Sequence, residues 1–188
     1  MAINFYRKIK RNISEDGLII SSSGFLVNNI VGKIDFSRTL CILEIGSGKG
    51  PFTKEIIRRM SGESTLDVCE IKAEYNPWIE RLMAEHPDKQ VQLHNGCVTG
   101  LLNAPERYDV IVSSLPLKNF TKMNDQNAFL YRLIEGFKFA LNEGGIYLQY
   151  QYFKSNKADI EAVFGKEMDG IDFVPLNILP AFVYSMIK

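Results

Sequence analysis

Short apolar runs alternate with longer segments of helical periodicity along most of the chain. Five runs rich in β-branched and other apolar residues predict strands at 39–45, 65–71, 90–94, 108–113 and 145–152. Apolar positions with helical spacing predict helices at 51–60, 74–85, 125–141 and 156–164. Pro51 suits the first turn of a helix, and Gly144-Gly145 is expected to close the third one. Strands that alternate with helices are typical of a parallel sheet with helical crossovers.

The last part of the chain departs from this alternation. Two extended runs, 171–178 and 181–187, are separated only by Leu179 and Pro180, which predicts an antiparallel hairpin. The predicted fold class is therefore α/β, with a mostly parallel sheet that ends in an antiparallel pair. A length of 188 residues favours a single domain, spanning 1–188, around one packed core.

The composition narrows the class of protein. With 46% hydrophobic residues and 22 basic against 22 acidic side chains, the chain resembles an ordinary soluble protein and not a broadly basic nucleic-acid binder. No apolar run reaches the roughly 18 to 20 residues of a membrane span, and we expect no secretory signal and a cytoplasmic location. The three widely spaced cysteines, Cys41, Cys69 and Cys97, favour reduced thiols over a disulfide framework or a metal site.

A buried strand leads directly into three glycines, Gly46, Gly48 and Gly50, and then into a helix. Glycines at such a turn permit positive φ angles and let a ligand approach the backbone, and we expect Gly46 and Gly48 to make this approach. A dinucleotide fingerprint would need glycine where the chain has Pro51, and a P-loop would need glycine at Leu43. The spacing therefore favours neither of these nucleotide-binding loops.

The segment from Glu44 to Gly50, Glu-Ile-Gly-Ser-Gly-Lys-Gly, resembles the E/D-x-G-x-G-x-G motif of class I S-adenosylmethionine-dependent methyltransferases. This resemblance implies a Rossmann-like seven-stranded sheet, S-adenosylmethionine as the cofactor, and a role for Glu44 at the cofactor's methionine end. Glu70 ends the second strand, where an acid can bind both ribose hydroxyls. The alternatives are a purely structural turn for the loop and a solvated strand end for Glu70.

The family commonly has a Gly-Asp pair after the third strand, whose aspartate contacts the adenine. Here the matching residues are Gly96 and Cys97, and we expect Cys97 to be a packed apolar residue that lines the adenine pocket. The predicted cofactor site comprises Glu44, Gly46, Ser47, Gly48, Gly50, Glu70, Ile71, Gly96, Cys97 and Ser113.

The fourth predicted strand ends in Ser114-Leu115-Pro116-Leu117, at the edge where open α/β sheets bind ligands. Related adenine methyltransferases, including ribosomal RNA dimethylases, have Asn-Leu-Pro-Tyr or a near variant here, whose amide and aromatic ring hold a flipped base. The chain lacks both groups, which argues against a nucleic-acid base as the methyl acceptor.

The chain also resembles the bacterial phospholipid N-methyltransferases, which are relatives of the RNA dimethylases. The segments that carry this resemblance are Ser-Ser-Leu-Pro-Leu at 113–117, Gly-Leu-Ile-Ile-Ser-Ser-Ser at 17–23, Leu-Gln-Tyr-Gln-Tyr at 148–152 and Leu-Pro-Ala-Phe-Val-Tyr at 179–184. Ile20 and Leu179 replace prolines of the family pattern. The resemblance implies phosphatidylethanolamine and its partly methylated derivatives as the phospholipid substrates, with transfer of methyl to the amine.

We predict catalytic roles for Ser114 and Tyr152, and substrate binding by Leu115, Pro116 and Tyr184. The two tyrosines could contact the methylated ammonium through cation–π interactions, or could simply pack in the core. His86 and His94 are not convincing general bases, so proton loss to water or to a lipid phosphate is the simpler expectation. Alternatives are methyl transfer to a small-molecule amine or an RNA adenine, and cofactor binding without catalysis.

Residues 2–13 carry four positive charges and no acid in a chain that is otherwise balanced. On a helix, Phe5, Ile9 and Ile13 would share one face, as expected for a segment that lies on an anionic membrane surface. The alternative is a helix that covers the cofactor site. Residues 1–35 are accordingly predicted to form an N-terminal helical cap, with the protein peripheral at the inner face of the membrane.

Overall fold

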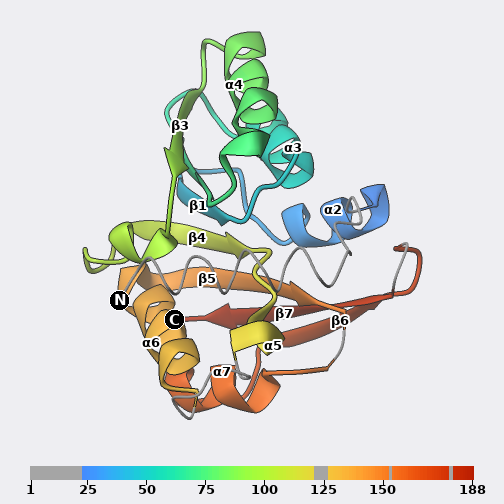
Figure 1. Cartoon of the computed structure of the whole chain (residues 1–188), viewed down its shortest axis with the longest axis vertical. Helices are drawn as coiled ribbons and strands as arrows, with labels where there is room; N and C mark the ends of the chain where they lie inside the picture. The colour runs from blue at the N-terminus through green and yellow to red at the C-terminus, as the bar shows by residue number, and fades with distance from the viewer. Residues whose placement is uncertain (1–22, 121–126, 153, 178–179) are drawn as a thin grey trace.

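The fold comes from a computed structural model that describes residues 23–120, 127–152, 154–177 and 180–188. Seven strands form one sheet in the order β3-β2-β1-β4-β5-β7-β6 (Figure 1). The first five strands are parallel, and β7 is antiparallel to both β5 and β6. The strands are β1 (Cys41–Ile45), β2 (Thr65–Glu70), β3 (Gln90–Asn95), β4 (Tyr108–Ser113), β5 (Leu141–Gln151), β6 (Gly170–Val174) and β7 (Ala181–Ile187). The predicted fold class is confirmed.

Helices cover both faces of the sheet because its central strands are apolar on both sides. One buried cluster joins the sheet to α2 (Gly24–Val31), α3 (Pro51–Arg59) and α4 (Asn76–Glu85). A second cluster joins the other face to α5 (Leu117–Phe120), α6 (Ala128–Ala140) and α7 (Lys157–Phe164). Short 3₁₀ turns occupy Ala73–Tyr75 and Val98–Gly100. The carboxyl ends of the parallel strands are left as the edge where a ligand can bind.

The start of β5 differs from the sequence prediction. Helix α6 ends at Ala140, and Leu141 is already extended, so Gly144-Gly145 lies inside the strand and does not close the helix. The Gly144 N–H donates to the carbonyl of Lys188, whose own N–H donates to Gly145. The two glycines therefore extend the pairing with β7, a long-range contact that local periodicity does not encode.

A carboxylate joins the amino ends of the central strands. Asp109 in β4 accepts hydrogen bonds from the Cys41 N–H, at 2.8 Å, and from the Asn142 side-chain amide, at 3.0 Å. Arg38 donates to the same carboxylate from the loop before β1. Strands β1, β4 and β5 are thus fixed to one another at the end opposite the candidate site.

Helix α2 is part of the packed core. Ser23 caps its first turn, and Leu26, Ile30 and Val31 are buried against the sheet. Asp172 of β6 pairs with Lys33 just after the helix and accepts a hydrogen bond from Asn29 within it. The basic segment 2–13 lies outside the described residues, so the N-terminal cap and the single-domain boundaries stay predictions.

If α2 belongs to the core, replacing Ile30 with alanine should lower the free energy of unfolding by about 2 to 5 kcal/mol through loss of buried contacts. The matched control is Phe25→Ala in the same helix, since Phe25 is 61% exposed and should change stability by about 0.5 kcal/mol or less. Urea unfolding measures both variants. Equal midpoints would show that α2 contributes nothing to the core.

Candidate active site

The glycine loop after β1 adopts a backbone that side chains disfavour. Gly46, Gly48 and Gly50 have φ angles of 76°, 54° and 78°, all in the left-handed region. The Gly46 N–H donates to the carbonyl of Cys69 in β2 at 2.8 Å. The loop thus turns sharply from the strand into α3, as the glycine spacing predicts.

The surroundings of two of these glycines differ. A Cβ added at Gly50 would lie 2.9 Å from side-chain atoms of Ile79 and Leu82, so glycine permits close packing against α4. A Cβ at Gly48 would meet no atom within 4 Å. Lys49 lies between them and places its Nζ 5.2 Å from the ring centroid of Trp78. Gly48 therefore leaves open space for a ligand, whereas Gly50 serves the packing behind the loop.

Glu44 is a fully buried acid at the end of β1. Its Oε2 accepts a hydrogen bond of 2.6 Å from the Thr53 hydroxyl, and its Oε1 is buried without a partner in the described structure. Burial raises the pKa of this carboxyl to about 7, against the lowering effect of Thr53. Because an unpaired buried carboxylate is costly, the site is suited to a cationic ligand.

Glu70 ends the second strand, as the sequence predicts, and its side chain connects that strand to the glycine loop. Its Oε2 accepts the Gly48 N–H at 2.8 Å, and its Oε1 accepts the Lys72 N–H at 2.9 Å. Each carboxylate oxygen has a further lone pair that can accept a hydrogen bond from a hydroxyl group. Glu70 can therefore hold the loop and bind ribose hydroxyls together.

The remaining predicted cofactor residues lie around this edge. The Ser47 hydroxyl is buried without a partner in the described structure, and Ile71 is half-buried. The Gly96 N–H donates to the Glu70 carbonyl at 3.0 Å. Cys97 is exposed and accepts a hydrogen bond from Thr99, so it is not packed as expected. Its contact with adenine stays a prediction.

The turn after β4 packs against the glycine loop. A Cβ at Gly46 would lie 3.6 Å from the Cβ of Ser114 and 3.7 Å from Leu115. The Ser114 N–H donates to the Ile45 carbonyl at 2.9 Å, while the Ser114 hydroxyl is buried without a partner in the described structure. Pro116 is exposed. The structure therefore brings the predicted acceptor residues of this turn beside the predicted cofactor residues.

Tyr152 and Tyr184 are not brought together. Tyr152 meets Tyr150 edge-on, with ring centroids 5.8 Å apart, and packs with the cluster that contains α2 and α3. Tyr184 is buried in the opposite cluster, and its hydroxyl donates to the Ser155 carbonyl at 3.3 Å. Burial raises the pKa of both phenols. Their contact with an acceptor stays a prediction.

Two side chains that sequence reasoning did not single out support the site. Thr53, three residues into the helix after the glycine loop, orients Glu44. Gln149 of β5 donates to the Leu115 carbonyl. His94, in contrast, contacts Asp67 at 2.8 Å and so has a structural partner.

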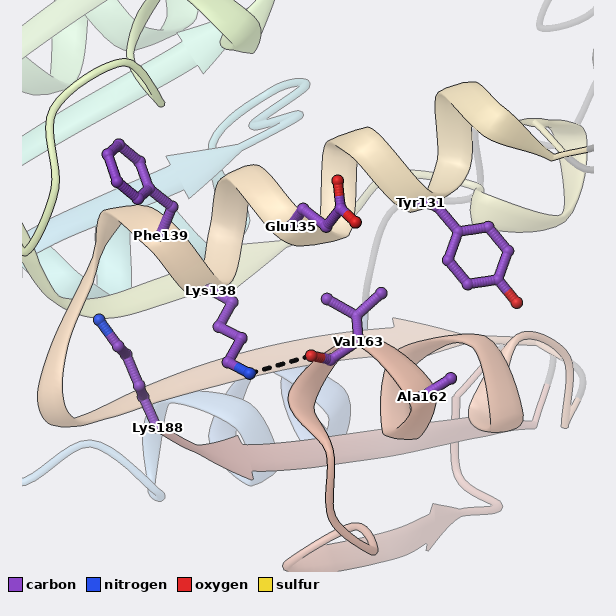
Figure 2. Close-up of a pocket in the computed structure, with 7 residues that line it drawn as sticks. All are labelled: Tyr131, Glu135, Lys138, Phe139, Ala162, Val163 and Lys188. Atoms are coloured by element: carbon purple, nitrogen blue, oxygen red, sulfur yellow. Dashed lines mark hydrogen bonds between the residues drawn. The ribbon is translucent and has the colours of Figure 1, made fainter.

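A groove of about 520 Å³ lies away from this edge, between α6 and α7 (Figure 2). Lys138 crosses it and donates to the Val163 carbonyl at 3.0 Å, while Lys188 approaches from the end of the chain. None of the predicted site residues lines this groove. The carboxyl edge of the sheet therefore remains the candidate site.

The sheet order, the antiparallel β7 and the glycine loop after β1 define the fold of the class I S-adenosylmethionine-dependent methyltransferases. No protein-family model matches the chain. A malonyl-[acyl-carrier protein] O-methyltransferase of Chlorobium luteolum is 28% identical over 124 residues, which are 66% of this chain. The chain spans only 44% of the length of that relative.

Solved structures share the fold at low sequence identity. A precorrin-6y C5,15-methyltransferase of Geobacter metallireducens superposes with a TM-score of 0.70 at 13% identity, covering 92% of this chain and 93% of that one. A SAM-dependent O-methyltransferase of Thermotoga maritima has a TM-score of 0.63 at 12% identity, covering 86% and 64%. At this level of identity these similarities show the fold, and none of them shows a phospholipid acceptor.

Glu44 should make cofactor binding depend on pH. Its raised pKa of about 7 means that the carboxyl is neutral below that pH and cannot pair with a cation, so affinity for S-adenosylmethionine should rise between pH 6 and 8. Calorimetry at several pH values across this range measures the change in affinity. Glu44→Gln should weaken binding by about 2 to 5 kcal/mol at pH 8 and remove the dependence. An equal pH profile in both proteins would contradict the assignment.

The two glycines should separate stability from ligand binding. Both Gly48→Ala and Gly50→Ala incur backbone strain of about 1 to 2 kcal/mol, but Gly50→Ala also overpacks α4, at a further cost of about 1 to 3 kcal/mol. Gly48→Ala should lose most of its affinity for the cofactor, because the new methyl group takes up space left for a ligand. It should still be the more stable of the two variants. Thermal unfolding of both variants, with and without cofactor, measures their stability and their binding. If Gly48→Ala is less stable than Gly50→Ala, the packing argument is refuted.

Proposed function

We propose that the chain binds S-adenosylmethionine and catalyses transfer of its methyl group. The buried Glu44 carboxylate carries this proposal, because it has an unpartnered oxygen and lies in β1 two residues before Gly46, where the glycine loop begins. The ammonium group of a methionine moiety would supply the missing charge. Glu70, which already holds the loop, would accept the ribose hydroxyls.

The residues of the chain would act by binding and alignment. The bound cofactor supplies an electrophilic methyl group on a sulfonium. The turn at Ser114 and Leu115 lies against the glycine loop and would orient the nucleophile of the acceptor toward that methyl group. None of the described groups stands out as a general base, so the proton would leave to water or to a phosphate of the acceptor.

For the acceptor we propose the amine of phosphatidylethanolamine. The sequence of the turn, Ser-Ser-Leu-Pro-Leu, and the matching segments elsewhere support this choice. Ser114, Leu115 and Pro116 carry no charge, which favours the neutral amine over the ammonium at the reacting atom. Such an amine has an ordinary pKa near ~10 and must lose a proton before it can attack.

A membrane contact belongs to the same proposal. The basic segment 2–13 would bind anionic lipid and bring the carboxyl edge of the sheet to the substrate. Within the described residues, no helix is long and apolar enough to cross a bilayer. We therefore propose a peripheral association at the cytoplasmic face.

The Chlorobium luteolum relative favours a second candidate acceptor, the carboxylate of a malonyl thioester. A carboxylate is already deprotonated at neutral pH, so it would need no base. The uncharged turn after β4 favours a neutral nucleophile, which makes this carboxylate the second candidate. The two acceptors differ in chemistry, and one assay distinguishes them.

Transfer of radiolabelled methyl should be measured to phosphatidylethanolamine vesicles, to a malonyl thioester and to ribosomal RNA. We expect label in the lipid, and Glu44→Gln should lower it at least tenfold, in line with the affinity loss of about 2 kcal/mol or more. Label in the malonyl ester would establish the second acceptor. Label in RNA alone would contradict both.

A further inference from the structure

Gln149 lies at the centre of the sheet, beside the proposed acceptor turn. Its Cα is paired with Ser113 of β4 on one side and with Tyr184 of β7 on the other. The side chain is fully buried. Its Nε2 donates to the carbonyls of Leu115 and Tyr150, at 3.0 and 2.7 Å, and its Oε1 accepts from the Tyr147 hydroxyl at 2.8 Å. Both N–H groups and the oxygen of the side-chain amide therefore have hydrogen-bond partners.

The backbone of Leu115 is held from both sides by buried side chains. Its N–H donates to the Ser113 hydroxyl at 3.3 Å, and its carbonyl accepts from Gln149 and from the Leu117 N–H, the latter at 2.9 Å. The neighbouring Ser114 N–H is bound to Ile45 of β1. The turn thus has a fixed position relative to β1 and β5, although it has no regular secondary structure.

Tyr147 fixes the orientation of the Gln149 amide. Its ring stacks on Phe137 of α6 and Phe164 of α7, with centroids 5.2 and 6.0 Å apart. Burial raises the pKa of its hydroxyl, which keeps the proton available for donation to Oε1. With the oxygen oriented toward Tyr147, the Nε2 of Gln149 is directed at Leu115.

We propose that Gln149 is a positioning residue for methyl transfer, oriented by Tyr147, which sets the place of the Ser114–Leu115 turn and hence of the acceptor. This inference rests on the proposed function of that turn. Gln149 acts through the backbone of Leu115, and among the described residues it shares no hydrogen bond with Glu44 or Glu70. Because the turn also packs against Gly46, Gln149 should affect the acceptor strongly and the cofactor only weakly.

The test compares three variants. Gln149→Met keeps the length of the side chain and removes its hydrogen bonds, so the KM of the acceptor should rise about tenfold. Tyr147→Phe keeps the stacked ring and should raise that KM about threefold. Asn142→Leu is the matched control, because it removes an amide hydrogen bond between β5 and β4 at the opposite end of the strands. It should lower the unfolding temperature and leave the acceptor KM unchanged.

Amide hydrogen exchange supplies a readout that does not depend on turnover. The Leu115 and Leu117 amides should exchange faster in Gln149→Met and keep their native rates in Asn142→Leu, while the KM of S-adenosylmethionine stays within about twofold in both. If Gln149→Met matches the control in exchange and in acceptor KM, the inference is overturned. If the native chain transfers no methyl group, the proposed function fails, and unchanged exchange in Gln149→Met would then overturn the positioning role as well.

Discussion

A carboxylate enclosed at the end of the central strand is the constraint on which the candidate site depends. Glu44 lies in β1, between β2 and β4, in a sheet covered on both faces, and among the described residues only Thr53 satisfies one of its oxygens. Burying such a group costs stability, and an apolar residue at that position would pack without this cost. The buried carboxylate therefore makes the folded chain less stable than an apolar residue would, and a bound cation would restore part of that stability.

The fold and the glycine loop were predictable because their signals are local. The alternation of apolar runs gave the order of elements, and the strand followed by Gly46, Gly48 and Gly50 indicated the ligand-binding turn. Glu70 could be placed because parallel strands end at a shared edge. These features need no knowledge of which side chains meet across the sheet.

Other features depend on contacts between distant segments. The early start of β5 follows from pairing of Leu141 with β4 and from the hydrogen bonds of Gly144 and Gly145 with Lys188. The amide of Gln149 is oriented by a tyrosine whose ring stacks on α6 and α7. Tyr152 and Tyr184 were grouped by chemistry, yet they belong to clusters on opposite faces of the sheet. Strand periodicity gives the alternation of side chains, but not which tyrosine a distant helix will cover.

The contact between Lys49 and Trp78 has a practical consequence. Trp78 is the only tryptophan of the sequence, and it lies on α4, behind the turn that Gly50 allows to pack closely. Indole emission depends on nearby charge, so any movement of the lysine when the loop is occupied would change the fluorescence of the whole protein. Ligand binding at the glycine loop could therefore be followed by the fluorescence of Trp78, without an added label.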